Sequence, residues 1–244
     1  MDPASTLPKG RWFERTHWSV VLAAGRPAEP DRTNALETLC RTYWEPIYAF
    51  LRCGGLDTHD AQDLTQSFFA HLLQRNRLEG LNPESGKFRS FLLTALKNYL
   101  NDKRDRARAI KRGGGQVSVP LDLNLAEGHL AHDPTSLPPE HSFDRQWAAE
   151  VLNQAFTRLQ EEFVGSGKQA QLIELAVFLG VEGSAPEYDA AACKLGTTRG
   201  AVAVAVHRLR HRYRDLVRAQ IAHTVRTACD LDDEMRYLLE IASQ

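Results

Sequence analysis

Apolar residues recur every three or four positions through most of the chain, which predicts helices because this spacing places them on one helix face. Gly54 and Gly55 separate the first two predicted helices, and Asn82 to Gly86 has turn chemistry before the third. We expect one helical bundle over residues 12–112, after a disordered N-terminus at residues 1–11. The three stripes are Leu36, Leu39, Cys40, Tyr43, Trp44, Ile47, Tyr48 and Leu51; Ala61, Leu64, Phe68 and Leu72; and Phe88, Phe91, Leu92, Ala95, Leu96, Tyr99 and Leu100.

The helical period stops at residues 113–140, where a run of three glycines at the start and four prolines further on predict a linker. A second helical domain follows over residues 141–222, and a C-terminal extension over residues 223–244. Outside Gln116 to Leu121 no strand-like alternation occurs, so the expected fold class is all-α, with two helical domains joined by a flexible linker. The later stripes are Trp147, Val151, Leu152, Ala155, Phe156 and Leu159; Leu172, Ile173, Ala176 and Leu179; Tyr188, Ala191, Ala192 and Leu195; Val202, Val206, Leu209, Tyr213, Leu216 and Val217; and Met235, Leu238, Leu239, Ile241 and Ala242.

The composition of the 244 residues is that of an ordinary globular protein, with 43% hydrophobic and 25% charged residues. No apolar run has the length of a membrane span, and the first ten residues lack the order of a secretory signal, so we expect a cytoplasmic protein without membrane insertion. The four cysteines are scattered, which indicates neither a metal site nor a disulfide framework, and no cofactor is expected.

Charge is segregated along the chain although the net charge is only −1. Residues 97–112 hold seven basic residues against two acids, and residues 199–218 hold six arginines against one acid. Residues 113–144 contain acids and no lysine or arginine, and residues 230–244 hold five acids against one arginine. Two basic patches, each at the end of an apolar stripe, favour two separate contacts with nucleic acid over two solvated helix faces.

The last helix pair of the second domain has the pattern of a helix-turn-helix. Ala192 allows the helices to approach closely, Gly196 provides the turn, and Thr198 is a natural N-cap for the second helix. Val202 and Val206 would fasten this helix to the first. Its other face and its C-terminal part would present basic side chains to phosphates or base edges, namely Arg199, His207, Arg208, Arg210 and Arg212.

Three segments, in family order, resemble the motifs of the extracytoplasmic-function sigma factors. DAQDLTQSFFAHL at residues 60–72 is similar to the polymerase-binding helix of region two, and FRSFLLTALKNYLNDKR at residues 88–104 to its promoter-melting helix. YDAAACKLGTTRGAVAVAVHRLR at residues 188–210 resembles the helix-turn-helix of region four. The resemblance implies a non-enzymatic alternative sigma factor, located with the nucleoid, that binds core RNA polymerase through its β′ and β subunits and directs promoter recognition, DNA melting and initiation.

The resemblance also assigns roles to residues of this chain. Asp60, Asp63 and Gln66, which share a helix face, would contact the coiled coil of the β′ subunit. The expected DNA-binding residues of region two are Lys97, Asn98, Asn101, Lys103, Arg104, Arg106 and Arg108. Those of region four are Thr198, Arg199, His207, Arg208, Arg210 and Arg212. We expect Phe88, Phe91 and Tyr99 to belong mainly to the core.

Several positions depart from the family pattern, the most consequential being Ala203, Val204 and Ala205, where the family carries polar and basic residues. These side chains have no donors and offer only apolar contact, for instance to thymine methyl groups. Gln62, Phe91 and Ala190 replace a glutamate, a tryptophan and an acid of the family motifs. We therefore expect most of the DNA affinity of region four to come from phosphate contacts.

Two rival interpretations are a helix-turn-helix regulator that acts without polymerase and a metal enzyme built on Asp57, His59, Asp60 and Asp63. The first leaves the region-two motif unexplained. The second lacks a second ligand cluster and a nucleophile, and we expect His59 to point away from Asp60 and Asp63. For control of the protein, an anti-sigma factor, phosphorylation and the C-terminal extension are all open. The extension would fold back and partly shield the region-four arginines.

Overall fold

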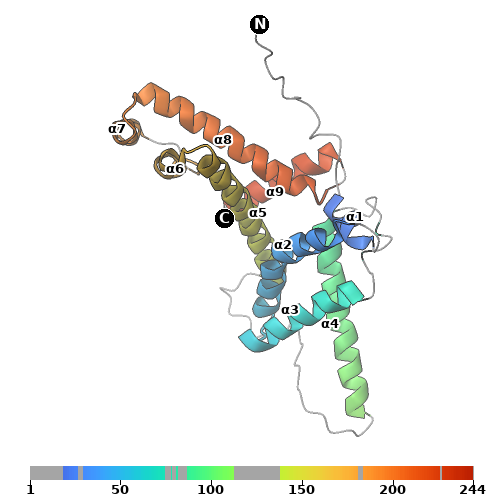
Figure 1. Cartoon of the computed structure of the whole chain (residues 1–244). Coiled ribbons are helices and arrows are strands. Elements are labelled where there is room, and N and C mark those ends of the chain that lie inside the picture. The colour runs from blue at the N-terminus through green and yellow to red at the C-terminus, as the bar shows by residue number, and fades with distance from the viewer. Residues whose placement is uncertain are drawn as a thin grey trace. The chain divides into compact units, whose positions relative to one another are not determined.

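The computed structural model describes residues 19–26, 30–74, 78, 81, 87–112, 138–180, 184–225 and 227–243, with backbone alone at 19, 74, 107–112 and 185–186. Every regular element in this part of the chain is a helix (Figure 1), which confirms the all-α fold class. The strand considered at Gln116 to Leu121, the turn at Asn82 to Gly86 and the predicted linker up to residue 137 lie outside the described residues. None of the described helices combines the length and the apolar character that a bilayer crossing requires.

The chain divides into two compact units. Unit 1 consists of Met1–Ala148 and Ala222–Gln244, and unit 2 of Ala149–Ile221. Unit 1 holds α1 (Ser19–Gly25), α2 (Arg32–Cys53), α3 (Thr58–Gln74), α4 (Phe88–Arg112) and α9 (Ala228–Ala242). Unit 2 holds α6 (Gln169–Ala176), α7 (Ala185–Lys194) and α8 (Arg199–Ala222), while α5 (Pro139–Gly165) contributes residues to both.

The core of unit 1 follows the predicted stripes of α2, α3 and α4. Its fully buried side chains include Tyr43, Phe68, Phe88 and Leu92. Tyr43 packs edge-on against Phe88 with ring centroids 5.4 Å apart. Phe88 and Tyr99 are buried as expected, whereas Phe91 is half-exposed. Helix α1, which the period did not predict, adds Val21 and Ala24 to the buried set.

The predicted helix of the C-terminal extension exists, but its buried side differs from the predicted stripe. The buried residues of α9 are Leu231, Glu234 and Leu238, whereas Leu239 is 61% exposed. A charged residue therefore occupies a core position of the helix, which an apolar pattern cannot reveal. Thr227 caps α9 by accepting a hydrogen bond from the Asp230 backbone N–H at 3.1 Å.

Unit 2 forms its core from the C-terminal part of α5 and from α6, α7 and α8. The predicted stripe of α6 is confirmed at Leu172, which is buried, but Leu175 and Phe178 are buried in addition while Ile173 is 64% exposed. Helix α7 begins with a capping box in which the Ser184 backbone N–H donates to the Glu187 carboxylate at 2.6 Å. The Tyr213 hydroxyl donates to the Leu152 carbonyl at 3.0 Å and so joins α8 to α5 within the unit.

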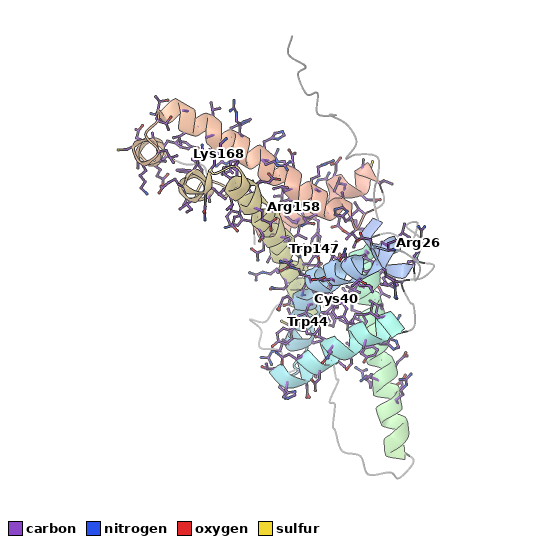
Figure 2. The ribbon with its side chains drawn as sticks, viewed as in Figure 1. Arg26, Cys40, Trp44, Trp147, Arg158 and Lys168 are labelled. Atoms are coloured by element: carbon purple, nitrogen blue, oxygen red, sulfur yellow. The ribbon has the colours of Figure 1, made fainter. Side chains whose placement is uncertain are left out.

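The boundaries of the units differ from those of the predicted domains. The second domain was predicted over residues 141–222, but residues 138–148 of the chain group with unit 1. Phe143 and Trp147 of this part of α5 are buried, and Figure 2 labels Trp147 on the helix. Since α5 runs unbroken from Pro139 to Gly165, its sequence carries no sign of the boundary. The extension, predicted as a separate segment, is also part of unit 1.

Candidate functional site

The first candidate surface is the polar face of α3. Its opposite face is buried through Ala61, Leu64 and Phe68, so Asp63 and Gln66 are exposed and Asp60 is half-exposed. Asp57 caps the helix by accepting a hydrogen bond from the Asp60 backbone N–H at 2.8 Å. The structure thus brings the three predicted polymerase-binding side chains onto one side of α3, where a partner has access to them.

His59 corrects one expectation on the same helix. It was expected to point away from Asp63, but its Nδ1 lies 3.6 Å from the Asp63 carboxylate, because residues four apart are neighbours on a helix. Both side chains are largely exposed. No group of three or more metal-ligating side chains occurs among the residues that the structure describes.

The second candidate surface is the C-terminal half of α4, where the structure separates the predicted DNA-binding residues by their surroundings. Asn98, Asn101 and Arg106 are exposed, and Lys103 and Arg104 are half-exposed. The Lys103 ammonium lies 5.4 Å from the centre of the Tyr99 ring. The side chain of Arg108 lies outside the described residues. Among the described side chains of α4, the two exposed amides and the Arg106 guanidinium are donors open to a partner.

Lys97, another of the predicted donors of α4, is paired with an acid within unit 1. Its ammonium lies 2.8 Å from the Glu140 carboxylate at the start of α5, and both side chains are about half-exposed. Burial raises the pKa of Glu140, but the hydrogen bond from Lys97, a backbone hydrogen bond and the nearby positive charges together outweigh this and hold the pKa below its usual value. A phosphate would have to compete with Glu140 for Lys97.

The turn of the helix-turn-helix has the geometry that the sequence predicts. Gly196 adopts φ +60°, in the left-handed region that favours glycine, between α7 and α8. Thr198 caps α8 by accepting a hydrogen bond from the Ala201 backbone N–H at 3.2 Å. Ala192, Val202 and Val206 are buried, as expected for residues that hold the two helices together. The turn therefore fixes the start of α8 on α7.

The exposed side of α8 carries only some of the predicted basic residues. Arg199, His207 and Arg208 are exposed, as are Ala203 and Val204, the latter at 51%. These five residues form what we call the α8 face. Because the apolar pair lies in this exposed set with the basic residues, the face combines charge with apolar contact area.

Arg210 and Arg212 are engaged within unit 2. The Arg210 Nε donates to the Phe178 carbonyl at 2.8 Å, which links α8 to the chain after α6. Arg212 forms a two-bond pair with the Glu162 carboxylate of α5. The hydrogen bonds from Arg212 lower the pKa of Glu162. Both arginines therefore hold α8 in place, a contribution that the sequence reading did not include.

A buried ionic cluster lies in unit 1, and the sequence analysis missed it. Arg89, the second residue of α4, binds Asp144 of α5 and the Glu234 carboxylate of α9, the latter at 3.2 and 3.3 Å. Lys87 lies 3.6 Å from Glu234. The Tyr237 hydroxyl donates to Asp144 at 2.6 Å. We call these five residues the Arg89 cluster. They lie far apart in the sequence, so no local sequence pattern could predict the cluster.

The environment of the Arg89 cluster is that of a protein core. Glu234 is 2% exposed and Asp144 8%. The Arg89 guanidinium lies over the rings of Trp147 and Tyr237, 5.0 and 4.5 Å from their centres. Burial alone would lower the pKa of Arg89, but the two carboxylates raise it above its usual value. Burial and the hydrogen bond to Asp144 raise the pKa of Tyr237 to about 12. Glu234, one of the five acids of the extension that was predicted to shield region four, thus binds Arg89 and Lys87.

Comparison with known proteins places the chain in a family. The family model described as "ECF sigma factor" matches residues 56–224, which covers α3 to α8 and more than half of the chain. A search of the curated proteins and a search of the solved structures each found no significant match. The chain belongs to the ECF sigma factor family, a non-enzymatic family of transcription factors whose members are alternative sigma factors.

Proposed function

We propose that the protein binds core RNA polymerase and directs it to promoters, where it takes part in DNA melting and transcription initiation. The observation that carries this proposal is the presence, in one chain of this family, of an accessible polar face on α3, a basic helix α4 and a capped helix-turn-helix. The protein would act in the cytoplasm, on the nucleoid, because its partners are there.

The proposed contact with polymerase is made by Asp60, Asp63 and Gln66. Two acids and an amide on the accessible side of α3 suit a basic partner helix, and the β′ coiled coil is the partner that the family implies. An anti-sigma factor that controls the protein would be expected to compete for the same surface.

The proposed contacts with DNA come from two helices. On α4, Asn98, Asn101 and Arg106 are exposed donors suited to phosphates and unstacked bases. On α8, Arg199, His207 and Arg208 would contact phosphates, which position the unit without specifying sequence. The apolar pair Ala203 and Val204 would make the base contacts of the α8 face, through thymine methyl groups.

A second candidate function is a helix-turn-helix regulator that binds duplex DNA without polymerase. The exposed arginines of the α8 face favour DNA binding in either case. The two functions differ in the dependence on core enzyme. A sigma factor shifts promoter DNA weakly alone and strongly with core enzyme, whereas the regulator shifts it equally well alone.

Co-purification with core enzyme tests the polymerase contact. Asp63→Arg should abolish association with core, because it places a positive charge against a basic partner surface. Asp63 is exposed, so the change should alter the free energy of unfolding by about 0.5 kcal/mol or less. Glu37→Arg, the same change of charge at an exposed position of α2, serves as the matched control and should retain binding. If Asp63→Arg binds core as the wild type does, the proposed contact is wrong.

A further inference from the structure

Helix α9 returns the chain to the unit in which the chain began. The chain leaves unit 1 after Ala148 and re-enters it at Ala222, so unit 2 is continuous with unit 1 at both of its ends. The family model ends at residue 224, before α9 begins at Ala228. The second attachment therefore depends on a segment that lies outside the family match.

The Arg89 cluster holds this segment in unit 1. Glu234 of α9 is almost fully buried and binds Arg89 and Lys87, while Tyr237 of the same helix binds Asp144. A buried carboxylate separated from its cationic partner is strongly unfavourable, because water cannot restore its solvation inside the protein. Release of α9 would break all of these bonds together.

The attachment begins immediately after α8. The Phe88 backbone N–H donates to the Thr224 carbonyl at 3.3 Å, and Val225 is 1% exposed. Leu231 and Leu238 of α9 are buried as well. Only Ala222 and His223 lie between the last residue of unit 2 and the Thr224 bond, so the second attachment has little slack.

We propose that docked α9 acts as a second tether on the helix-turn-helix unit and thereby restricts the promoter spacings that the protein accepts. This inference rests on the proposed function, in which α4 and α8 engage two elements of one promoter. A domain connected at one end can adopt every position that this one connection allows. A domain connected at both ends is limited to the positions that both connections allow.

A small change in promoter spacing moves a DNA element by several ångström, which is enough for a second attachment to resist. One base pair adds about 3.4 Å along the DNA axis and about one tenth of a turn, so a change of two base pairs moves an element by about 7 Å. DNA that must twist or bend to compensate for this displacement resists the deformation, which lowers the transcript yield. A Gly/Ser insertion of eight residues has a mean end-to-end distance of about 16 Å, which exceeds that displacement.

The test is run-off transcription by core enzyme and full-length protein on promoters whose two elements are separated by spacers varied in single base pairs. The informative variant carries eight Gly/Ser residues between His223 and Thr224, which lengthens the second attachment and leaves the bonds of α9 in place. The control carries the same eight residues after Gln244. Glu234→Gln is a second variant, which weakens the docking of α9 without lengthening the chain.

The wild type and the control should lose about tenfold of the transcript two base pairs from the optimum, and the insertion variant about twofold. Glu234→Gln should broaden the profile in the same direction. An insertion variant with the wild-type profile, or one inactive at every spacing, would overturn the inference, as would a wild type with a flat profile. A wild type that gives no core-dependent transcript at any spacing contradicts the proposed function instead.

Discussion

Arg89→Met should destabilise unit 1 strongly, because Arg89 is the centre of the Arg89 cluster. The substitution keeps most of the side-chain volume but leaves the carboxylates of Asp144 and Glu234 buried, with only Tyr237 and Lys87 as neighbours in the cluster. Removal of one partner of a buried ion pair costs about 3–5 kcal/mol. We expect the free energy of unfolding of unit 1 to fall by that amount.

The size of this effect follows from burial. Glu234 and Asp144 are 2% and 8% exposed, so neither carboxylate can regain much hydration in the folded state. The stacking of Arg89 on Trp147 and Tyr237 is lost as well. The energies of contacts made by one side chain are not additive, so the estimate of about 3–5 kcal/mol already includes this loss. A loss of this size is a large share of the 5–15 kcal/mol of an ordinary domain.

Urea unfolding followed by tryptophan fluorescence is the appropriate measurement. Trp44 and Trp147 both lie in unit 1, so their fluorescence reports on the unfolding of this unit. Arg41→Met, at an exposed position of α2, is the matched control and should change the free energy of unfolding by about 0.5 kcal/mol or less.

The double variant Arg89→Met with Glu234→Met separates the ionic contribution from packing. It removes one of the stranded carboxylates, so it should be less destabilised than the sum of the two single variants, by about 1–3 kcal/mol. The reasoning is refuted if Arg89→Met is as stable as the Arg41→Met control, or if the effects of the two single variants simply add.

Three further predictions concern single side chains. Tyr237→Phe should lower the free energy of unfolding of unit 1 by about 1.5–3 kcal/mol, because the hydrogen bond to Asp144 is lost. Since the pKa of Tyr237 is raised to about 12, the difference between wild type and variant should be constant below pH 10 and shrink as the pH rises towards 12. A difference that does not depend on pH would contradict this. Arg208→Ala should reduce the salt slope of holoenzyme–promoter affinity by about one at matched and scrambled upstream elements alike. If the variant instead discriminates less between the two elements and its salt slope is unchanged, Arg208 contacts bases and not phosphates. Arg210→Ala should lower the stability of unit 2 by about 1 kcal/mol, measured as an earlier urea transition by circular dichroism, because the bond to the Phe178 carbonyl is lost, and an unchanged transition would show that this bond contributes nothing.

The features that the sequence predicted correctly are determined by neighbours in the chain. The apolar periods of α2, α3, α4 and α8 identify buried faces, since a helix places residues three and four apart on one side. Gly196 and Thr198 were predicted as turn and cap because both act within three residues of themselves. Helix α1 is seven residues long, and Val21 and Ala24 are its buried apolar side chains among the described residues, so its period is too brief to be recognised.

The features that the sequence did not predict depend on distant residues. Arg89 is 55 positions from Asp144 and 145 from Glu234, so no local pattern connects them. Arg212 has the same appearance in the sequence as Arg208, but only Arg212 meets an acid from α5. The basic count of α8 therefore overestimates the charge that remains available to DNA, and only the tertiary structure distinguishes the two arginines.

Core-dependent promoter melting tests the central proposal most directly. Genomic fragments that yield run-off transcripts with core enzyme and this protein would be probed with permanganate, which reacts with unpaired thymines. Reactive thymines should appear near the transcript start only when core enzyme and protein are both present, and Asp63→Arg should abolish them while Glu37→Arg preserves them. Melting that is unaffected by Asp63→Arg, or fragments bound by the protein alone and never opened with core enzyme, would contradict the proposal.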